Sequence, residues 1–528
     1  MRRLHPDIIE VVAKVIRENS GDGATSLMSQ VLLLILISTL ARICFASVLG
    51  LGIDESYMVA AGRELHLSYF DHPPISWWLT WGAMHFFGND SPLEVRLPFI
   101  LLFALTTWLM YRLGATLFGE RAGLWSAIAL NLSPVFAISA GSGVLPDGPL
   151  MAAMLAAALC LAHLFFTPDA SVPWGWLGAG LFGGLALLSK YHGIFIFAGA
   201  ALFVLTHPER LRWLKSPWPY VGALLGLLIF SPVLIWNAEH HWVSFLFQGG
   251  RSRPEGIDPL RVLVALGGQA LYVAPWIWIP LMFVVYRALK LGRADAKRWL
   301  LLCLAAGPIL AFSIVPIWST GRILPHWAAP GYLMLFPLLG AAIADALEQT
   351  KAQMRIRTWA VGSAGFLLAT TILIGAEVKM GWIERAWPTA AAKGEPLLEM
   401  LNWSEVKTAL AERGFLDRQN LFVASSKWYE AGKLGYALSG SLPVRCLSQD
   451  PREFGVLNRP DERANDDALI IGAKLSDPQL MALYGKSFDR IDTLDPIIIH
   501  HAGRPAITLS VYYGHRFHPD AVHFGWPA

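Results

Sequence analysis

The residues best suited to chemistry in this sequence are acids placed at the ends of long apolar stretches. Asp54 and Glu55 directly follow the first such stretch, and Asp147 stands between two later ones. A carboxylate at the mouth of a membrane span is costly to desolvate, so it tends to be paired or to belong to a site. In a site, it could accept the proton of an attacking hydroxyl. The alternatives are a solvated loop for Asp54 and Glu55 and a helix N-cap for Asp147.

Cationic and polar aromatic residues occur at the same ends of the apolar stretches. Lys acts toward phosphate as a point charge and Arg as a bidentate donor, so cations beside acids suit an anionic, phosphate-bearing substrate. Snorkelling toward lipid headgroups explains any one of these cations equally well, so only their convergence would indicate a site. The predicted substrate-binding residues are Tyr57, His72, Lys190, His192, Arg251, Arg253, Arg322 and His326.

The composition requires a membrane environment for the elements that hold these residues. Of the 528 residues, 55% are hydrophobic and 15% are charged, against about a quarter charged in a typical soluble domain. The net charge of +3, without a basic run interleaved with aromatics, gives no support for a nucleic-acid partner. The four cysteines form no CxxC pair and indicate neither a disulfide framework nor a zinc site.

The apolar stretches predict about eleven membrane-spanning helices. Each stretch approaches the roughly 20 residues needed to cross the hydrocarbon core of a bilayer. The expected helices cover residues 28–51, 92–118, 122–141, 148–166, 174–189, 191–206, 218–236, 262–286, 299–317, 324–346 and 357–378. Residues 174–206 could instead form one long tilted helix, which would reverse the orientation of every later loop.

The positive-inside rule decides between these alternatives. With two helices at 174–206, the basic loops at 210–215, 287–298 and 351–357 share one side with the basic N-terminus. We therefore expect a cytoplasmic amphipathic segment at 1–27 and a transmembrane domain at 28–380. The long outer loops, 52–91 and 237–261, then lie together on the opposite face, in contact with the same membrane lipids.

The chain changes character after about residue 380. Apolar runs shorten to strand length at 420–424, 468–472 and 506–513, and they alternate with helical patterns at 427–438 and 477–483. We expect residues 381–528 to form a small α/β domain outside the membrane. The predicted fold class is thus a mainly α polytopic membrane protein with a C-terminal α/β domain.

Six short motifs follow one another in a fixed order along the apolar region. They are Asp54-Glu55, His72-Pro73-Pro74, Arg96-Leu97-Pro98, Phe118-Gly119, Asp147-Gly148-Pro149-Leu150 and Leu188-Ser189-Lys190. This order resembles the bacterial branch of the GT-C glycosyltransferases of family 39, which includes protein O-mannosyltransferases and lipid A aminoarabinose transferases. The resemblance covers residues 28–380 in topology and is most specific at 54–150.

The resemblance implies a transferase at the periplasmic face of the bacterial inner membrane that takes a sugar from a polyprenyl-phosphate carrier. It implies that Asp54 is the catalytic carboxylate and that Glu55 and Asp147 line the same cavity, so all three acids are predicted catalytic residues. Asp54 would accept the proton of the acceptor hydroxyl, and cations would stabilise the departing lipid phosphate. A single displacement of this kind inverts the anomeric centre. The expected acceptor is a lipid or a cell-envelope glycan.

One departure from the family raises a metal site as an alternative. The aminoarabinose transferases carry Glu-Lys before the two prolines, with the Glu associated with a metal, whereas this chain has Asp71-His72. Asp71, His72 and His240 could bind a divalent ion such as Zn²⁺, Mn²⁺ or Mg²⁺. Equally, His72 could replace the lysine as a phosphate contact. The same departure weakens the expectation of an aminoarabinose donor or a lipid A acceptor.

Three other functions remain open from the sequence. Within the enzyme class, the alternative is a protein O-glycosyltransferase. A membrane transporter is a weaker alternative, because the acids cluster in outer loops and not near the bilayer midplane. A scaffold that only anchors the C-terminal domain would not need about eleven spans.

Overall fold

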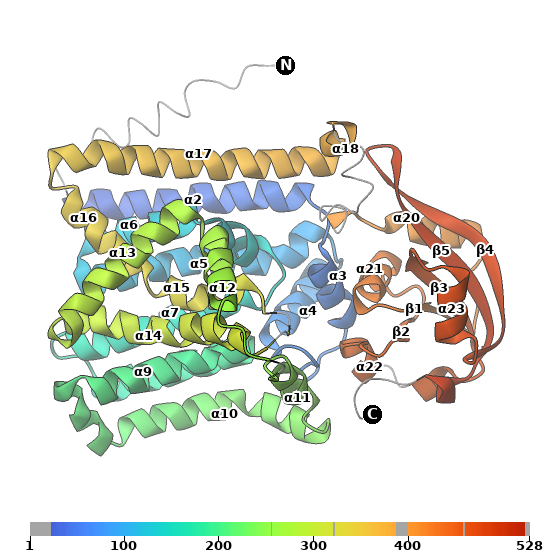
Figure 1. The fold of residues 1–528 in the computed structure, drawn as a ribbon, viewed down its shortest axis with the longest axis horizontal. Coiled ribbons are helices and arrows are strands. Elements are labelled where there is room, and N and C mark those ends of the chain that lie inside the picture. Colours follow the sequence, from blue (N-terminus) through green and yellow to red (C-terminus); the bar gives the residue numbers. More distant parts are fainter. Residues whose placement is uncertain are drawn as a thin grey trace.

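The computed structural model describes residues 23–254, 256–319, 321, 323–386, 400–457 and 460–522. A helical bundle forms one part of the molecule, and a smaller α/β domain packs against one end of it (Figure 1). This arrangement confirms the predicted fold class. The amphipathic segment expected before the first span lies outside the described residues.

The long helices of the bundle run roughly side by side (Figure 1). They correspond to the predicted apolar stretches, including two separate helices at 174–206. The helices are α2 (Gly23–Val48), α5 (Pro92–Phe118), α6 (Glu120–Leu132), α7 (Asp147–Phe166), α8 (Val172–Ser189), α9 (Ile194–Thr206), α10 (Trp218–Glu239), α12 (Arg261–Val273), α13 (Pro275–Leu291), α14 (Ala296–Ile314), α15 (Ala329–Leu333), α16 (Phe336–Ala346) and α17 (Thr350–Met380).

The number of helices able to span a membrane differs from the expected eleven. Within the described ranges, seven helices are long and apolar enough, or ten if each of three bent pairs counts as one span. The predicted helix at 122–141 is divided in two. Helix α6 ends at Leu132, before Pro134, and a separate short π-helix covers Val135–Ala140. The predicted helix at 262–286 is bent by 113° between α12 and α13.

The bend between α12 and α13 has a local cause. Ala274 adopts a φ of +82°, a conformation that is unfavourable for a residue with a Cβ atom. Pro275 follows as the first residue of α13, where its missing N–H costs nothing. Ala274 therefore ends one helix and Pro275 begins the next in a new direction.

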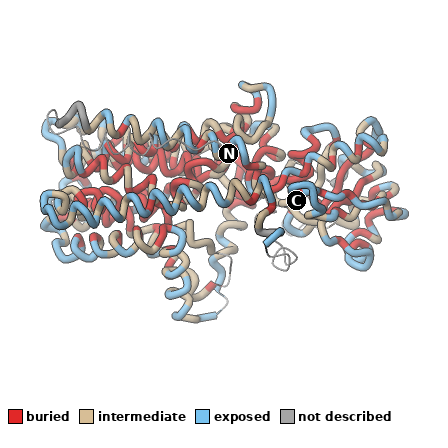
Figure 2. The backbone as a smooth tube through the Cα atoms, turned by 90° about the horizontal axis from the view of Figure 1, so that it is seen from above, coloured by how far each residue is buried: buried red, intermediate tan, exposed pale blue. Residues whose placement is uncertain are grey.

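Apolar surface on the outer faces of the bundle fits a lipid environment. Figure 2 shows buried residues on the inner sides of the helices and exposed residues on the outer sides. Apolar patches of this extent are unfavourable in water but not in hydrocarbon. Large exposed apolar side chains include Leu36, Leu224, Leu228, Phe283 and Leu368.

Three short helices lie at the end of the bundle that faces the α/β domain. These are α3 (Ile53–Ala61) and α4 (Ile75–Phe87), from the first outer loop, and α11 (Val243–Gly250), from the second. Figure 1 shows them between the long helices and the C-terminal sheet. The two predicted outer loops therefore lie at the same end of the molecule.

The C-terminal domain contains one five-stranded sheet with the strand order β2-β1-β3-β5-β4. Strands β2, β1 and β3 are parallel, and β5 and β4 are antiparallel to their neighbours. The predicted strands correspond to β1, β3 and β5, whereas β2 and β4 were not expected. The elements are α20 (Ser404–Glu412), β1 (Leu421–Ser425), α21 (Trp428–Leu438), β2 (Val444–Cys446), α22 (Glu453–Leu457), β3 (Asp467–Ala473), α23 (Asp477–Tyr484), β4 (Phe488–His501) and β5 (Arg504–Phe517).

Helix α21 packs closely against α3, the helix that carries the predicted catalytic acids. A Cβ atom on Gly432 would lie 2.8 Å from the Cα atom of Tyr57, and one on Gly435 would lie 2.8 Å from the Cβ atom of Ala60. Glycine at both positions thus lets the two backbones approach. Lys433, between them, donates to the carbonyl oxygen of Leu51 at 2.5 Å. The C-terminal domain therefore packs directly against the first outer loop.

Candidate functional site

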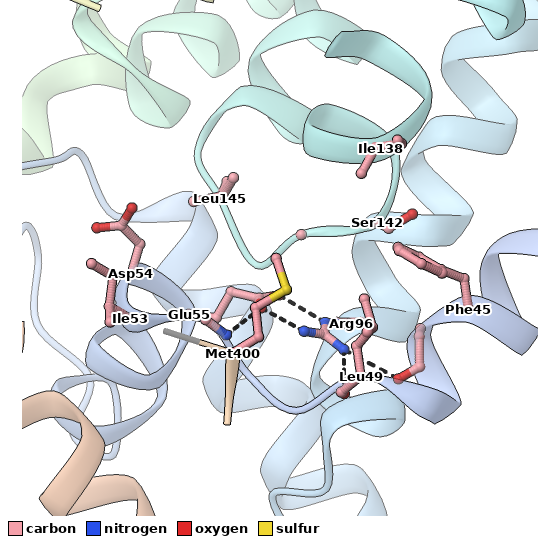
Figure 3. Close-up of a pocket in the computed structure, with 13 residues that line it drawn as sticks. Phe45, Leu49, Ile53, Asp54, Glu55, Arg96, Ile138, Ser142, Leu145 and Met400 are labelled. Carbon is pink, nitrogen blue, oxygen red and sulfur yellow. Dashed lines mark hydrogen bonds and ion pairs between the residues drawn. The ribbon is translucent and has the colours of Figure 1, made fainter. Parts of the chain in front are cut away.

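Asp54 and Glu55 lie in the first turn of α3 but have different surroundings. Asp54 is exposed, whereas Glu55 is buried. Both line a cavity of about 300 Å³ between the end of α2, α3 and the chain segment before α7. Figure 3 shows the Asp54 carboxylate directed away from the Glu55 side chain. The other lining residues are mostly apolar and include Phe45, Leu49, Ile138, Leu145 and Met400.

Arg96 of α5 holds Glu55 in a buried ion pair. Its Nε donates to Glu55 Oε1 at 2.8 Å and its Nη2 to Glu55 Oε2 at 2.5 Å. The remaining guanidinium hydrogens are donated to backbone carbonyls at the end of α2, so all five donors are used. These carbonyls belong to Ala46 at 3.1 Å, Leu49 at 2.9 Å and Gly50 at 2.7 Å.

Glu55 also connects α3 to the segment that precedes α7. Oε1 accepts from the backbone N–H of Val144 at 3.0 Å, and Oε2 accepts from that of Gly52 at 2.9 Å. Although burial raises the pKa of Glu55, the charge and hydrogen bonds of Arg96 bring this pKa below its ordinary value. Glu55 is therefore a carboxylate at neutral pH, and each of its oxygens accepts two hydrogen bonds.

Asp147, at the start of α7, forms a second buried ion pair with Lys190. The Lys190 Nζ atom lies 3.0 Å from each carboxylate oxygen of Asp147. Lys190 directly follows α8, in the break before α9, where the backbone is extended. This break, predicted from the sequence, turns the ammonium group toward the N-terminus of α7.

Three histidines and an arginine surround this second ion pair. His192 and His326 lie within electrostatic reach of Asp147, and His72 within reach of Lys190, Asp147 and Arg251. In the described part of the chain, His72 Nδ1 and His192 Nε2 are buried without a hydrogen-bond partner. The structure thus brings together five predicted binding residues, which come from the first outer loop, the α8–α9 break, α11 and the segment before α15: His72, Lys190, His192, Arg251 and His326.

Burial determines the protonation state of His72. It lowers the pKa of His72 to about 4, an effect that Asp71 opposes and the Lys190 and Arg251 charges reinforce. The imidazole is therefore neutral at pH 7. An anion placed beside it would favour the imidazolium form.

The predicted metal ligands are not assembled into a ligand set. Among the described residues, no three His, Cys, Asp or Glu side chains lie close enough together to hold a metal ion. The Asp71 carboxylate accepts hydrogen bonds from Tyr57 and Arg452. His240 Nδ1 lies 2.7 Å from the carbonyl oxygen of Trp236, and the two rings are stacked.

The other predicted binding residues lie elsewhere. Tyr57 is buried in the contact with the C-terminal domain, where its hydroxyl donates to Asp71 at 3.2 Å and accepts from the backbone N–H of Glu453 at 2.9 Å. Burial raises the pKa of Tyr57 well above its ordinary value. Arg253 is exposed in the loop after α11. Arg322 lies outside the described residues.

Sequence reasoning missed two residues that shape the site. The first is Arg96, which belongs to the Arg96-Leu97-Pro98 motif; an arginine inside an apolar stretch is a signal of an intramembrane ion pair. The second residue is Arg452, which pairs with Asp71 at 2.9 Å. Nothing in the sequence near Arg452 indicates this contact, because its partner is 381 residues away.

Comparison with solved structures identifies the overall fold. The crystal structure of ArnT from Cupriavidus metallidurans in the apo state matches with a TM-score of 0.63 and 14% identity, over 92% of this chain and 98% of that one. The same enzyme bound to undecaprenyl phosphate matches equally, with a TM-score of 0.63 and 15% identity, over 91% and 97% of the two chains. The chain has the GT-C fold.

Sequence comparisons agree with the GT-C fold over part of the chain. Residues 71–236 match the family model described as dolichyl-phosphate-mannose-protein mannosyltransferase. The lipid A galacturonosyltransferase RgtD of Rhizobium johnstonii is 23% identical over 53% of this chain and 58% of its own length. An undecaprenyl phosphate-alpha-4-amino-4-deoxy-L-arabinose arabinosyl transferase of Sodalis glossinidius is 26% identical over 54% and 51%. The matches therefore span little more than half of these relatives.

The Glu55–Arg96 pair of this GT-C fold yields a test of stability. Removing one partner of a buried ion pair leaves an uncompensated charge, which costs about 3–5 kcal/mol. We expect Arg96→Met to lower the midpoint of thermal unfolding of the detergent-solubilised protein strongly. The double variant Arg96→Met with Glu55→Gln should recover part of the loss. A double variant less stable than Arg96→Met would contradict the pairing.

Proposed function

We propose that this protein is a glycosyltransferase that moves a sugar from a polyprenyl-phosphate carrier to an acceptor at the outer face of the bacterial inner membrane. One observation carries the proposal. An exposed carboxylate, Asp54, stands on a helix fixed by a buried ion pair, and it lies at the same end of a GT-C bundle as a cluster of cations and imidazoles.

Asp54 is proposed as the general base. It lines the cavity at the tip of α3 and is exposed, so an acceptor hydroxyl can approach its oxygens. The carboxylate accepts the hydroxyl proton while the acceptor oxygen bonds to the anomeric carbon and the bond from that carbon to the phosphate oxygen breaks. This single displacement inverts the anomeric centre.

Glu55 and Asp147, expected to be catalytic, are assigned positioning roles. Both oxygens of Glu55 are occupied by Arg96 and backbone N–H groups. Asp147 accepts two hydrogen bonds from Lys190. Glu55 thus fixes the orientation of α3, and Asp147 fixes the position of the Lys190 ammonium.

The cluster around Lys190 is proposed as the binding site of the donor phosphate. Two of the three ammonium hydrogens of Lys190 are donated to Asp147, so one can be donated to a phosphate oxygen. Arg251 adds a positive charge, and the unpartnered nitrogens of His72 and His192 can donate to an anion. Cations fixed before the reaction stabilise the charge that develops on the leaving phosphate.

The acceptor is proposed to be a lipid of the cell envelope. The names of the curated relatives include a lipid A galacturonosyltransferase. The cavity beside Asp54 has mostly apolar walls, which include Phe45, Leu49 and Ile138 and suit a hydrophobic acceptor. A protein hydroxyl is the second candidate, because the matching family model is described as a protein mannosyltransferase.

The orientation in the inner membrane is part of the proposal. Basic residues gather at the bundle end opposite the α/β domain, where Lys297 donates to the carbonyl oxygen of Leu117 and Arg293 to that of Thr206. By the positive-inside rule, this end faces the cytoplasm. Asp54, the donor cluster and the C-terminal domain then face the periplasm.

Replacement of Asp54 tests the catalytic assignment. With polyprenyl-phosphate sugars of different head groups as donors and a membrane extract as acceptor, Asp54→Asn should lose at least about a hundredfold in kcat, because general-base catalysis contributes about 10²–10⁴. Donor binding and the unfolding midpoint should stay at the wild-type values. The readout is release of free polyprenyl phosphate. Turnover by Asp54→Asn within tenfold of wild type would contradict the assignment.

The low pKa of His72 predicts the pH dependence of donor binding. Because its pKa is about 4 and an adjacent phosphate raises it, binding of the donor is coupled to proton uptake. The affinity for the donor should therefore rise as the pH falls from about 7 to 5. His72→Gln, which cannot be protonated, should remove this rise. An equal pH dependence in both proteins, measured by donor titration, would count against a phosphate contact for His72.

A further inference from the structure

Arg452 lies in the contact between the C-terminal domain and the two outer loops. The Nη1 atom of Arg452 lies 2.9 Å from Asp71 Oδ2. The guanidinium group also stacks between two rings, 4.6 Å from the centre of the Trp428 ring and 4.7 Å from that of the Phe247 ring. A single side chain of the C-terminal domain thus contacts both outer loops of the membrane domain.

Two of the contacts of Arg452, those with Asp71 and Phe247, lie one step from a residue of the proposed phosphate site. Asp71 directly precedes His72 in the chain. The Phe247 ring also packs against the Arg251 guanidinium, whose carbon lies 4.6 Å from the ring centre. Arg452 is therefore linked to His72 through Asp71 and to Arg251 through Phe247.

Neighbouring contacts limit the movement of the same loop. Glu453 accepts a hydrogen bond from the backbone N–H of Phe70 at 2.5 Å. From α11, Gln248 donates to the carbonyl oxygen of Asp71 at 2.6 Å, and Ser244 donates to that of Tyr69 at 3.0 Å. Residues 69–72 are therefore held between α11 on one side and the start of α22 on the other.

The backbone of Arg452 indicates that this arrangement is imposed on it. Arg452 has a φ of +54°, and the left-handed region is unfavourable for a residue with a Cβ atom. Such strain persists only where the surroundings fix the conformation. Here the ion pair, the two rings and the buried carboxylate of Glu453 provide these surroundings.

We propose that Arg452 is a positioning residue for the donor-phosphate site, acting through Asp71 on His72 and through Phe247 on Arg251. In this proposal the C-terminal domain shapes the donor-phosphate site through Arg452. This inference rests on the proposed function. Among the described residues, Asp71 belongs to no group of metal ligands. The proposal instead gives Asp71 a role as the partner of Arg452.

A kinetic experiment with the full-length protein in detergent tests the proposal. Arg452→Met should raise the KM for the polyprenyl-phosphate sugar donor at least about tenfold, with kcat within about twofold of wild type. Arg452→Lys, which keeps the charge opposite Asp71, should recover part of the affinity. Arg418→Met is the matched control, because Arg418 stacks on Phe415 and Tyr513 within the C-terminal domain and is exposed. It should behave as wild type.

A double-variant measurement of the coupling between Arg452 and Asp71 is the second part of the experiment. Asp71→Asn should raise the donor KM as Arg452→Met does, and the double variant should be no worse than either single variant, because both remove the same interaction. An unchanged donor KM in Arg452→Met, or strictly additive effects in the double variant, would overturn the proposal. An equal rise in the Arg418→Met control would also overturn it, since the effect would then be one of general stability.

Hydrogen exchange separates failure of this inference from failure of the proposed function. Without any substrate, Arg452→Met should speed amide exchange in residues 69–72, whereas Arg418→Met should not. Absence of turnover by the wild-type protein with every donor would refute the proposed function alone. Unchanged exchange in residues 69–72 of Arg452→Met would refute the positioning role, whatever the activity.

Discussion

The arrangement of the outer end of this protein depends on the buried ion pair between Arg96 and Glu55. All five donors of Arg96 are used, three on the carbonyls of Ala46, Leu49 and Gly50 at and just after the end of α2 and two on Glu55. Glu55 in turn accepts the backbone N–H of Val144, three residues before Asp147. One guanidinium therefore joins the end of the first span, the helix that carries Asp54 and the start of α7. This buried ion pair is costly to break, because removing either partner would leave the other as a buried charge without compensation.

The two buried pairs divide the chemistry between them. Glu55 is fixed by Arg96, so the neighbouring Asp54 can face the cavity from a rigid helix turn. Asp147 fixes Lys190 in the same way, close to the imidazoles of His72, His192 and His326. Glu55 and Asp147 thus bind cations of the protein, whereas Asp54 is exposed and lines the cavity.

Much of this organisation follows from the sequence, and the exceptions have physical causes. Long apolar runs predicted the helices, and short apolar runs of strand length predicted β1, β3 and β5. The order of the helices brought His72, Lys190, His192, Arg251 and His326 to one region. The bend after Ala274 depends on a backbone conformation that composition does not reveal. The pairing of Glu55 with Arg96, 41 residues away, and of Asp71 with Arg452 depends on tertiary packing, which local patterns do not encode. For this reason Glu55 and Tyr57 could be placed near the site but not given their partners.

The most direct test of the account is a structure of the wild-type protein with a non-transferable donor, a polyprenyl phosphonate in which carbon replaces the oxygen between the sugar and the phosphorus. We expect the phosphonate oxygens within about 3.2 Å of the Lys190 Nζ atom and of the Arg251 guanidinium. The anomeric carbon should face the Asp54 carboxylate from the side opposite the phosphonate. A head group bound away from Lys190, or an anomeric carbon that Asp54 cannot approach, would contradict the account.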